Sequence, residues 1–140
     1  MNKIEFNTQI VTTIEQSRRL LELGLKPETS DMLILPLPNS KELIVQKYED
    51  ESENLYYTIK GEEWESSPAW SLHRLITMFP YKVNKSPNNA SLLEITRIKD
   101  NCYIVGYYGY KVVEMPLFDS VIRLIEELIK DNIFNKDYLK

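Results

Sequence analysis

Apolar residues recur every three or four positions in three segments of this chain, a spacing that predicts amphipathic helices. The predicted helices cover residues 13–23, residues 67–80 and a final segment that begins at Pro116. The first has capping-box spacing at its start and ends before Gly24, which suits the left-handed residue that follows a helix. The final segment has so broad an apolar face that it closes either a core or a dimer, and the sequence leaves both open.

Alternating apolar and polar residues predict strands between these helices. The predicted strands cover residues 43–48, 55–59, 92–98, 102–108 and 110–114, with turns at the acidic residues 49–53 and at residues 99–101. The apolar run 32–37 is at best an edge strand, because Pro36 and Pro38 would each remove a hydrogen-bond donor from a central strand. The order helix, strands, helix, strands, helix predicts a single α+β domain over residues 1–140, with about three helices packed on an antiparallel sheet. We allow for disorder in the first and last few residues.

The helix predicted for residues 67–80 places a tryptophan away from its own apolar stripe. Ser67 is the predicted N-cap, and Pro68 lies in the first turn. At about 100° per residue, Trp70 clusters with His73 and Arg74, roughly opposite the stripe. The stripe consists of Leu72, Leu75, Ile76 and Phe79. An indole in this position needs a second surface to cover it.

Either this chain or a partner can supply that surface. Burial against the chain's own segment around Trp64 is favoured, because monomers seldom leave large aromatic side chains exposed. An exposed Trp70 would instead form an interaction hot spot with Arg74, whose guanidinium can cover the indole from one turn along the helix. We take Trp64, Trp70, His73 and Arg74 as the candidate contact surface for another protein.

The chain has 17 basic and 21 acidic residues, which gives a formal net charge of −4. The excess acidity lies mainly between Glu49 and Glu65, where Lys60 is the only base. The rest of the chain is close to neutral, so no charge over the whole sequence attracts nucleic acid. Nucleic acid is therefore not favoured as a partner.

Several features of the sequence predict a cytoplasmic protein. No apolar run approaches the roughly 20 residues that span a bilayer, so a membrane is excluded as a partner. The first residues lack the apolar central region of a secretory signal. Cys102 is the single cysteine, which excludes an intramolecular disulfide and agrees with a reducing compartment. Its place in a predicted strand indicates a buried, inert thiol.

Few residues of this chain can support catalysis. His73 is the only histidine, and no motif links it to Cys102, so a nucleophilic Cys/His pair is not favoured. A zinc site would need more such ligands, residues 49–53 lack the ligand spacing of a calcium loop, and no glycine-rich phosphate motif occurs. We predict no catalytic residue, no metal and no cofactor, although paired carboxylates can be neither identified nor excluded without geometry.

Four tyrosines crowd one predicted hairpin and could form a stacking platform for bases or a peptide. They are Tyr103, Tyr107, Tyr108 and Tyr110. Alternation sends Tyr103 and Tyr107 to one face of the sheet and Tyr108 to the other. Lys111 is the only adjacent base, which favours tyrosines that pack in the sheet with their hydroxyl groups at its rim.

Two stretches carry a resemblance to known proteins. Residues 16–32 read QSRRLLELGLKPETSDM, residues 67–80 read SPAWSLHRLITMFP, and an apolar helix follows near the carboxyl end. In these features the chain resembles a group of small uncharacterised proteins encoded in prophages and mobile elements of anaerobic gut bacteria. The resemblance implies an origin on a mobile element and a dispensable or regulatory role rather than a metabolic one. It brings no activity, ligand or catalytic residue.

Taken together, these patterns favour a small cytoplasmic accessory protein that acts by binding, with another protein or a second copy as its partner. One alternative is a small enzyme that uses carboxylates and tyrosines in a cleft beside the sheet. Another is an acidic mimic of nucleic acid that acts on a host defence protein, which the stretch from Glu49 to Glu65 suggests. A net charge of only −4 counts against the mimic.

Overall fold

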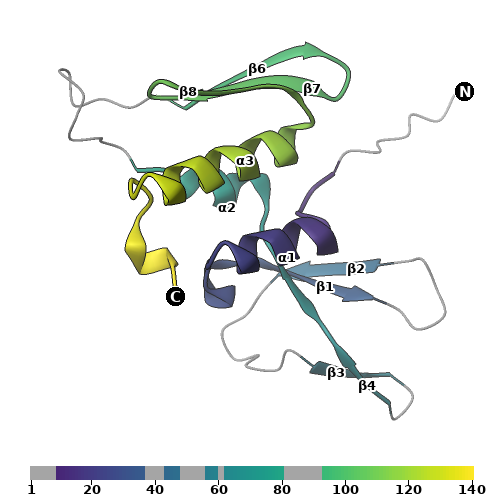
Figure 1. The fold of residues 1–140 in the computed structure, drawn as a ribbon. Coiled ribbons are helices and arrows are strands. Elements are labelled where there is room, and N and C mark those ends of the chain that lie inside the picture. Colours follow the sequence, from purple (N-terminus) through teal and green to yellow (C-terminus); the bar gives the residue numbers. More distant parts are fainter. Residues whose placement is uncertain (1–8, 37–42, 48–55, 60–61, 81–92) are drawn as a thin grey trace, which may run out of the picture.

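The computed structural model describes residues 9–36, 43–47, 56–59, 62–80 and 93–140. Within them, helices and strands follow the predicted order and confirm the α+β class (Figure 1). The α-helices are α1 (Ile14–Glu22), α2 (Leu72–Thr77) and α3 (Leu117–Lys130), and two short 3₁₀ helices cover Pro27–Thr29 and Lys136–Tyr138. The strands are β1 (Met32–Pro36), β2 (Leu43–Lys47), β3 (Tyr56–Ile59), β4 (Glu62–Glu65), β5 (Ser67–Ala69), β6 (Leu93–Lys99), β7 (Cys102–Tyr107) and β8 (Tyr110–Met115).

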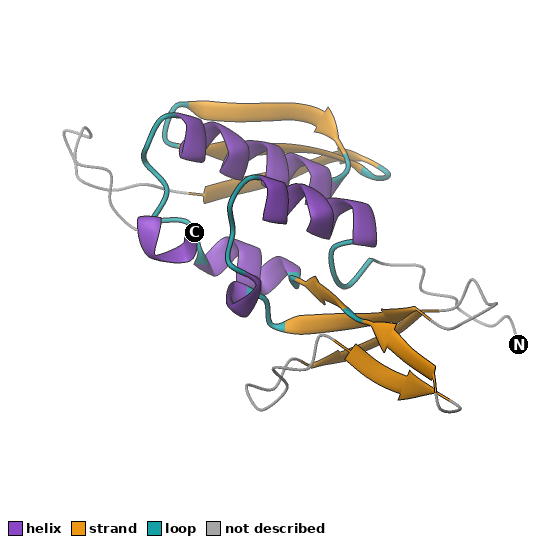
Figure 2. Ribbon diagram, turned by 60° about the horizontal axis from the view of Figure 1, so that its bottom comes forward, coloured by secondary structure: helices purple, strands orange, loops and turns teal. Residues whose placement is uncertain are grey.

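The described strands pair in an antiparallel manner and form three small sheets. Their strand orders are β2-β1-β5, β3-β4 and β6-β7-β8. The helices lie between the β6-β7-β8 sheet on one side and the other two sheets on the opposite side (Figure 2). The α3 helix packs directly on β7 and β8.

The first strand contradicts the prediction of an edge position. β1 pairs with β2 on one side and with β5 on the other, so it is the central strand of its sheet. Pro36 is tolerated because it is the last residue of β1, beyond the three residues that pair with β5. Pro38 lies outside the described residues.

The pairing of the next strands also differs from the prediction. β2 was expected to form a hairpin with the strand that follows residues 49–53, but it pairs with β1, and β3 pairs with β4. The sequence analysis missed both β4 and β5, because β4 carries acidic residues and β5 was assigned to a helix. The predicted acidic turn itself lies outside the described residues.

The second helix begins later than predicted. Ser71, not Ser67, is its N-cap, and the Ser71 hydroxyl accepts a hydrogen bond from the backbone N–H of Arg74. Residues 67–69 pair with β1 instead, because proline suits an edge strand as well as the first turn of a helix. Trp70 therefore precedes the helix, and the helical argument that set it opposite the apolar stripe was wrong.

The predicted final helix closes the core. Its buried apolar side chains are Phe118, Val121, Ile122, Leu124, Ile125 and Leu128. They join one cluster with residues of α1, α2 and β7, among them Leu20, Leu75 and Val105. The choice between a core and a dimer for this helix is thus decided in favour of the core.

Local signals elsewhere gave the observed structure. Thr13 caps α1 in a capping box with Gln16, and Gly24 follows the helix with a φ of 102°. The carboxyl terminus lies beside this turn, where Leu139 pairs with Leu25 and the Lys140 N–H donates to the Gly24 carbonyl at 2.8 Å. No helix among the described residues is long and apolar enough to cross a membrane.

Candidate functional site

Trp70, the centre of the predicted contact surface, is part of the core. Its side chain is 0% exposed, and its indole Nε1–H donates a hydrogen bond to the Thr29 hydroxyl at 3.1 Å. Its backbone N–H donates to Oγ1 of Thr12 at 3.1 Å, and its carbonyl accepts from the Thr12 N–H at 2.9 Å. A side chain with no exposed surface cannot touch a partner, so including Trp70 in the contact surface was wrong. The burial that the sequence favoured is confirmed.

The other members of that predicted surface do not gather around the indole. His73 is exposed on α2, while Arg74 is half-buried and occupied by its own chain. The Arg74 Nε–H donates to the Thr29 carbonyl at 2.7 Å, and its guanidinium lies 5.8 Å from the centre of the Tyr138 ring. Trp64 lies in β4 opposite Tyr57, and its side chain is outside the described residues. A contact through His73 remains a prediction.

A different surface stands out on the β6-β7-β8 sheet. One face of this sheet packs on α3, and no described helix or strand lies over the opposite face (Figure 1). We call this opposite face the outer face. Strand alternation and the hollow described below give its residues as Glu94, Thr96, Ile98, Ile104, Gly106, Lys111 and Val113. Ile98 and Val113 are each 49% exposed, although both are large and apolar.

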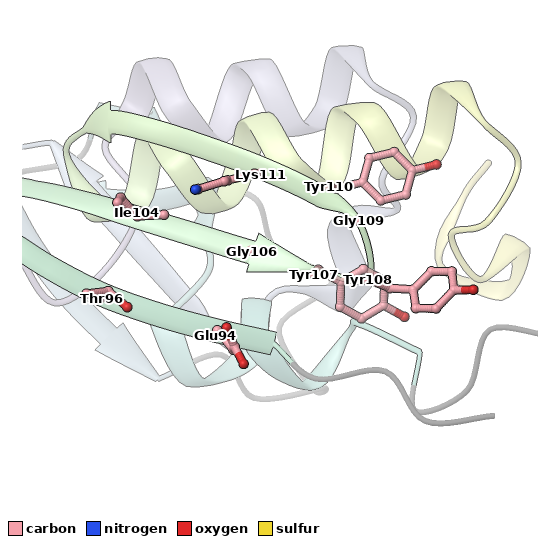
Figure 3. Close-up of a pocket in the computed structure, with 9 residues that line it drawn as sticks. All are labelled: Glu94, Thr96, Ile104, Gly106, Tyr107, Tyr108, Gly109, Tyr110 and Lys111. Carbon is pink, nitrogen blue, oxygen red and sulfur yellow. The ribbon is translucent and has the colours of Figure 1, made fainter. Parts of the chain in front are cut away.

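The outer face carries opposite charges on its two edge strands. Glu94 of β6 pairs with Gly106 of β7, which pairs with Lys111 of β8, so the three residues form one row across the sheet. Because the central residue has no side chain, the row is open between its charges, and a hollow of about 490 Å³ lies there and along the β7–β8 turn (Figure 3). A Cβ atom on Gly106 would meet only the Tyr110 carbonyl, at 3.6 Å, so neither the backbone nor its neighbours require a glycine here.

The tyrosines of the β7–β8 hairpin are used by the fold. Tyr107 is buried, its hydroxyl donates to the Pro80 carbonyl at 2.7 Å, and its ring centre lies 5.3 Å from that of Phe79. The Tyr110 hydroxyl donates to the Asp131 carboxylate at 2.5 Å, and this hydrogen bond raises the pKa of Tyr110 to about 12. Predicted packing is confirmed for these two side chains.

The structure brings together few groups with catalytic potential. Cys102 is buried in β7, as predicted for an inert thiol, and His73 is exposed on α2. In the described part of the chain, no three His, Cys, Asp or Glu side chains cluster as a metal site would require. Glu94 is the one carboxylate that lines the hollow beside the sheet.

Comparisons of this sequence with protein-family models, with curated proteins and with solved structures find no match. What the chain does must therefore be inferred from its own surface. The sequence analysis missed the outer face, because its attention went to the tyrosines. The signal was present in the hairpin turns, which fix the register and hence the Glu94, Gly106, Lys111 row.

Proposed function

We propose that this chain is a protein-binding module, a small cytoplasmic accessory protein of phage or mobile-element origin, and that its partner is a second copy of itself. The contact surface in this proposal is the outer face. The observation that carries it is the row Glu94, Gly106, Lys111, which sets an acid and a base on opposite edges of an uncovered sheet.

This arrangement of charges is self-complementary. A two-fold rotation about an axis parallel to β7 would place Glu94 of each copy over Lys111 of the other. Sheets that pack face to face lie about 10 Å apart, a gap that glutamate and lysine side chains span together. A two-fold contact uses the same patch on both copies, so each dimer would contain this charge pair twice.

Apolar side chains supply the attraction that such a contact needs. Ile98 and Val113 lie farther along β6 and β8, and the same rotation brings each over the partner's opposite edge strand. Each buried square ångström of apolar surface contributes about 25 cal/mol, whereas exposed ion pairs contribute about 0–1 kcal/mol. The apolar residues would thus stabilise the dimer, and the charges would set its orientation.

A charge swap tests this geometry directly. Glu94→Lys and Lys111→Glu each convert both charge pairs of the dimer into like-charge contacts. We expect each to weaken dimerisation at least about tenfold in sedimentation equilibrium. The double variant Glu94→Lys/Lys111→Glu exchanges the two charges and restores both pairs, so its dimer affinity should return to near that of the wild type.

Matched controls separate this effect from net charge. Glu28→Lys and Lys136→Glu make the same changes at exposed positions away from the outer face, and they should leave dimerisation unchanged. A chain that stays monomeric up to about 1 mM, where even a weak dimer is populated, would overturn the proposal. So would a double variant that associates no better than the single ones.

The two alternatives from the sequence have no comparable support. The enzyme alternative requires several acids in a cleft beside the sheet, and the hollow there is lined by one, Glu94, together with tyrosines. The acidic mimic rests on residues between Glu49 and Glu65, of which 48–55 and 60–61 lie outside the described residues.

A further inference from the structure

A second cavity lies between α1 and the end of β4, on other elements than the outer face. Its volume is about 270 Å³. Ile14, Arg18 and Leu21 line it from α1, at a spacing that puts all three on one side of the helix. The opposite wall is the segment 65–68, which runs from the end of β4 into β5.

The wall of this cavity contains a buried hydroxyl without a partner. Ser66 is 5% exposed, and its Oγ is the one buried side-chain oxygen or nitrogen in the described part of the chain that has no hydrogen bond. Native proteins leave few such groups unpaired, because an unsatisfied buried polar atom is costly. The neighbouring Ser67 differs, since its hydroxyl donates to the Pro68 carbonyl at 3.2 Å.

Two opposite charges flank the same cavity. Arg18 and Glu65 are both exposed, and neither forms an ion pair with the other or with any described residue. Arg19, the next residue of α1, is instead paired with Glu126 of α3 at 2.5 Å. One arginine of this helix thus serves the fold, while the other stands free beside a cavity.

We propose that this cavity binds a free α-amino acid with an apolar side chain. Arg18 would hold the carboxylate, Glu65 the ammonium group, and the Ser66 hydroxyl would hydrogen-bond one of these polar groups. Ile14, Leu21 and Pro68 would contact the apolar side chain. At about 30 Å³ per liquid water, the cavity holds about nine waters, or one small organic molecule in their place.

The charge pattern favours a zwitterion over related ligands. A peptide terminus carries only one of the two charges, and a fatty acid or an amine likewise satisfies only one of Arg18 and Glu65. Leucine is the probe, and isovalerate and isoamylamine are its matched halves, which lack the ammonium and the carboxylate respectively. In calorimetric titration, we expect leucine to bind with a dissociation constant of about 1 mM or tighter, and each half at least about tenfold more weakly.

Substitutions locate the binding on these residues. Arg18→Gln and Glu65→Gln are changes at exposed positions, which rarely disturb folding, and each should weaken leucine binding at least about tenfold. Ser66→Ala should weaken binding as well without lowering the melting temperature of the free protein, because the hydroxyl it removes has no partner there. Arg19→Gln is the matched control on the same helix and should bind leucine as the wild type does.

Three results would overturn this inference. They are no saturable binding of leucine, equal binding of leucine and one of its halves, and unchanged binding by Arg18→Gln together with Glu65→Gln. The inference does not depend on dimerisation through the outer face. Glu94→Lys should bind leucine with unchanged affinity, so a failure of either proposal can be recognised separately.

Discussion

The indole Nε1–H of Trp70 donates a hydrogen bond to the Thr29 hydroxyl at 3.1 Å, although the two residues lie 41 positions apart in the chain. Thr29 is central to this contact, because its hydroxyl also donates to the Lys26 carbonyl at 2.7 Å and its own carbonyl accepts from Arg74. The bond joins the segment before α2 to the 3₁₀ helix Pro27–Thr29. It also satisfies the one polar atom of an otherwise apolar side chain, which allows the indole to be fully buried.

A double-mutant cycle measures this bond. Thr29→Val leaves the indole N–H buried without its acceptor, so we expect the free energy of unfolding to fall by about 1–3 kcal/mol. Trp70→Phe removes both the donor and part of the buried ring, with a loss of similar or greater size. Because the donor is absent in the double variant, its loss should be smaller than the sum by about 1 kcal/mol. Urea unfolding followed by circular dichroism gives these values, and strict additivity would show that the bond contributes nothing.

Asp31 orients the start of α2 from outside the helix. Its carboxylate accepts hydrogen bonds from the backbone N–H of Ser71 at 2.8 Å and from the Ser71 hydroxyl at 2.5 Å. Asp31→Ala should lower the free energy of unfolding by about 1–2 kcal/mol, because it removes both the acceptor and a negative charge near a helix N-terminus. Asp31→Asn should cost less, since one acceptor oxygen remains. Asp100→Asn, in an exposed turn, is the control and should change stability by less than about 0.5 kcal/mol.

The start of α2 also shows where sequence reasoning fails. Ser67 and Ser71 are both suitable N-caps, and Pro68 fits either a first helical turn or an edge strand. The choice is made by pairing of residues 67–69 with β1, more than thirty positions earlier in the chain. Short-range patterns contain no record of that contact, so the predicted helix was too long and Trp70 was misplaced.

Elements with local signals were predicted well. The capping box and Gly24 delimit α1, and the turn at residues 100–101 joins β6 and β7 as expected, with Asn101 at a φ of 52°. The candidate sites were not predicted. The row across the outer face depends on two consecutive registers, and the cavity beside Ser66 depends on packing of α1 against β4 and β5.

Stability should fall in acid because of one carboxylate between α1 and α3. The hydrogen bond from Arg19 lowers the pKa of Glu126 below 4.5, and Arg123 adds a second ion pair at 3.3 Å. A carboxyl whose pKa is depressed in the folded state stabilises the fold above its unfolded pKa and loses that contribution as pH falls through its folded pKa. Unfolding measured between neutral pH and about pH 3 should thus show a decline beginning near pH 4.5. Glu126→Gln should flatten this decline, and Glu15→Gln, an exposed change on α1, should leave it unchanged.

Gly106 offers a test in which folding and association move in opposite directions. Its φ is not in the left-handed region, and an added Cβ would meet the Tyr110 carbonyl at an ordinary 3.6 Å. Gly106→Thr should therefore raise the free energy of unfolding of the monomer by about 0.5–1 kcal/mol, because a β-branched residue restricts the unfolded chain and suits a strand. In the proposed dimer, Gly106 lies at the two-fold axis, so the new side chains of both copies would meet there and weaken association at least about tenfold. A stabilised variant that dimerises as well as the wild type would exclude the outer face as the contact.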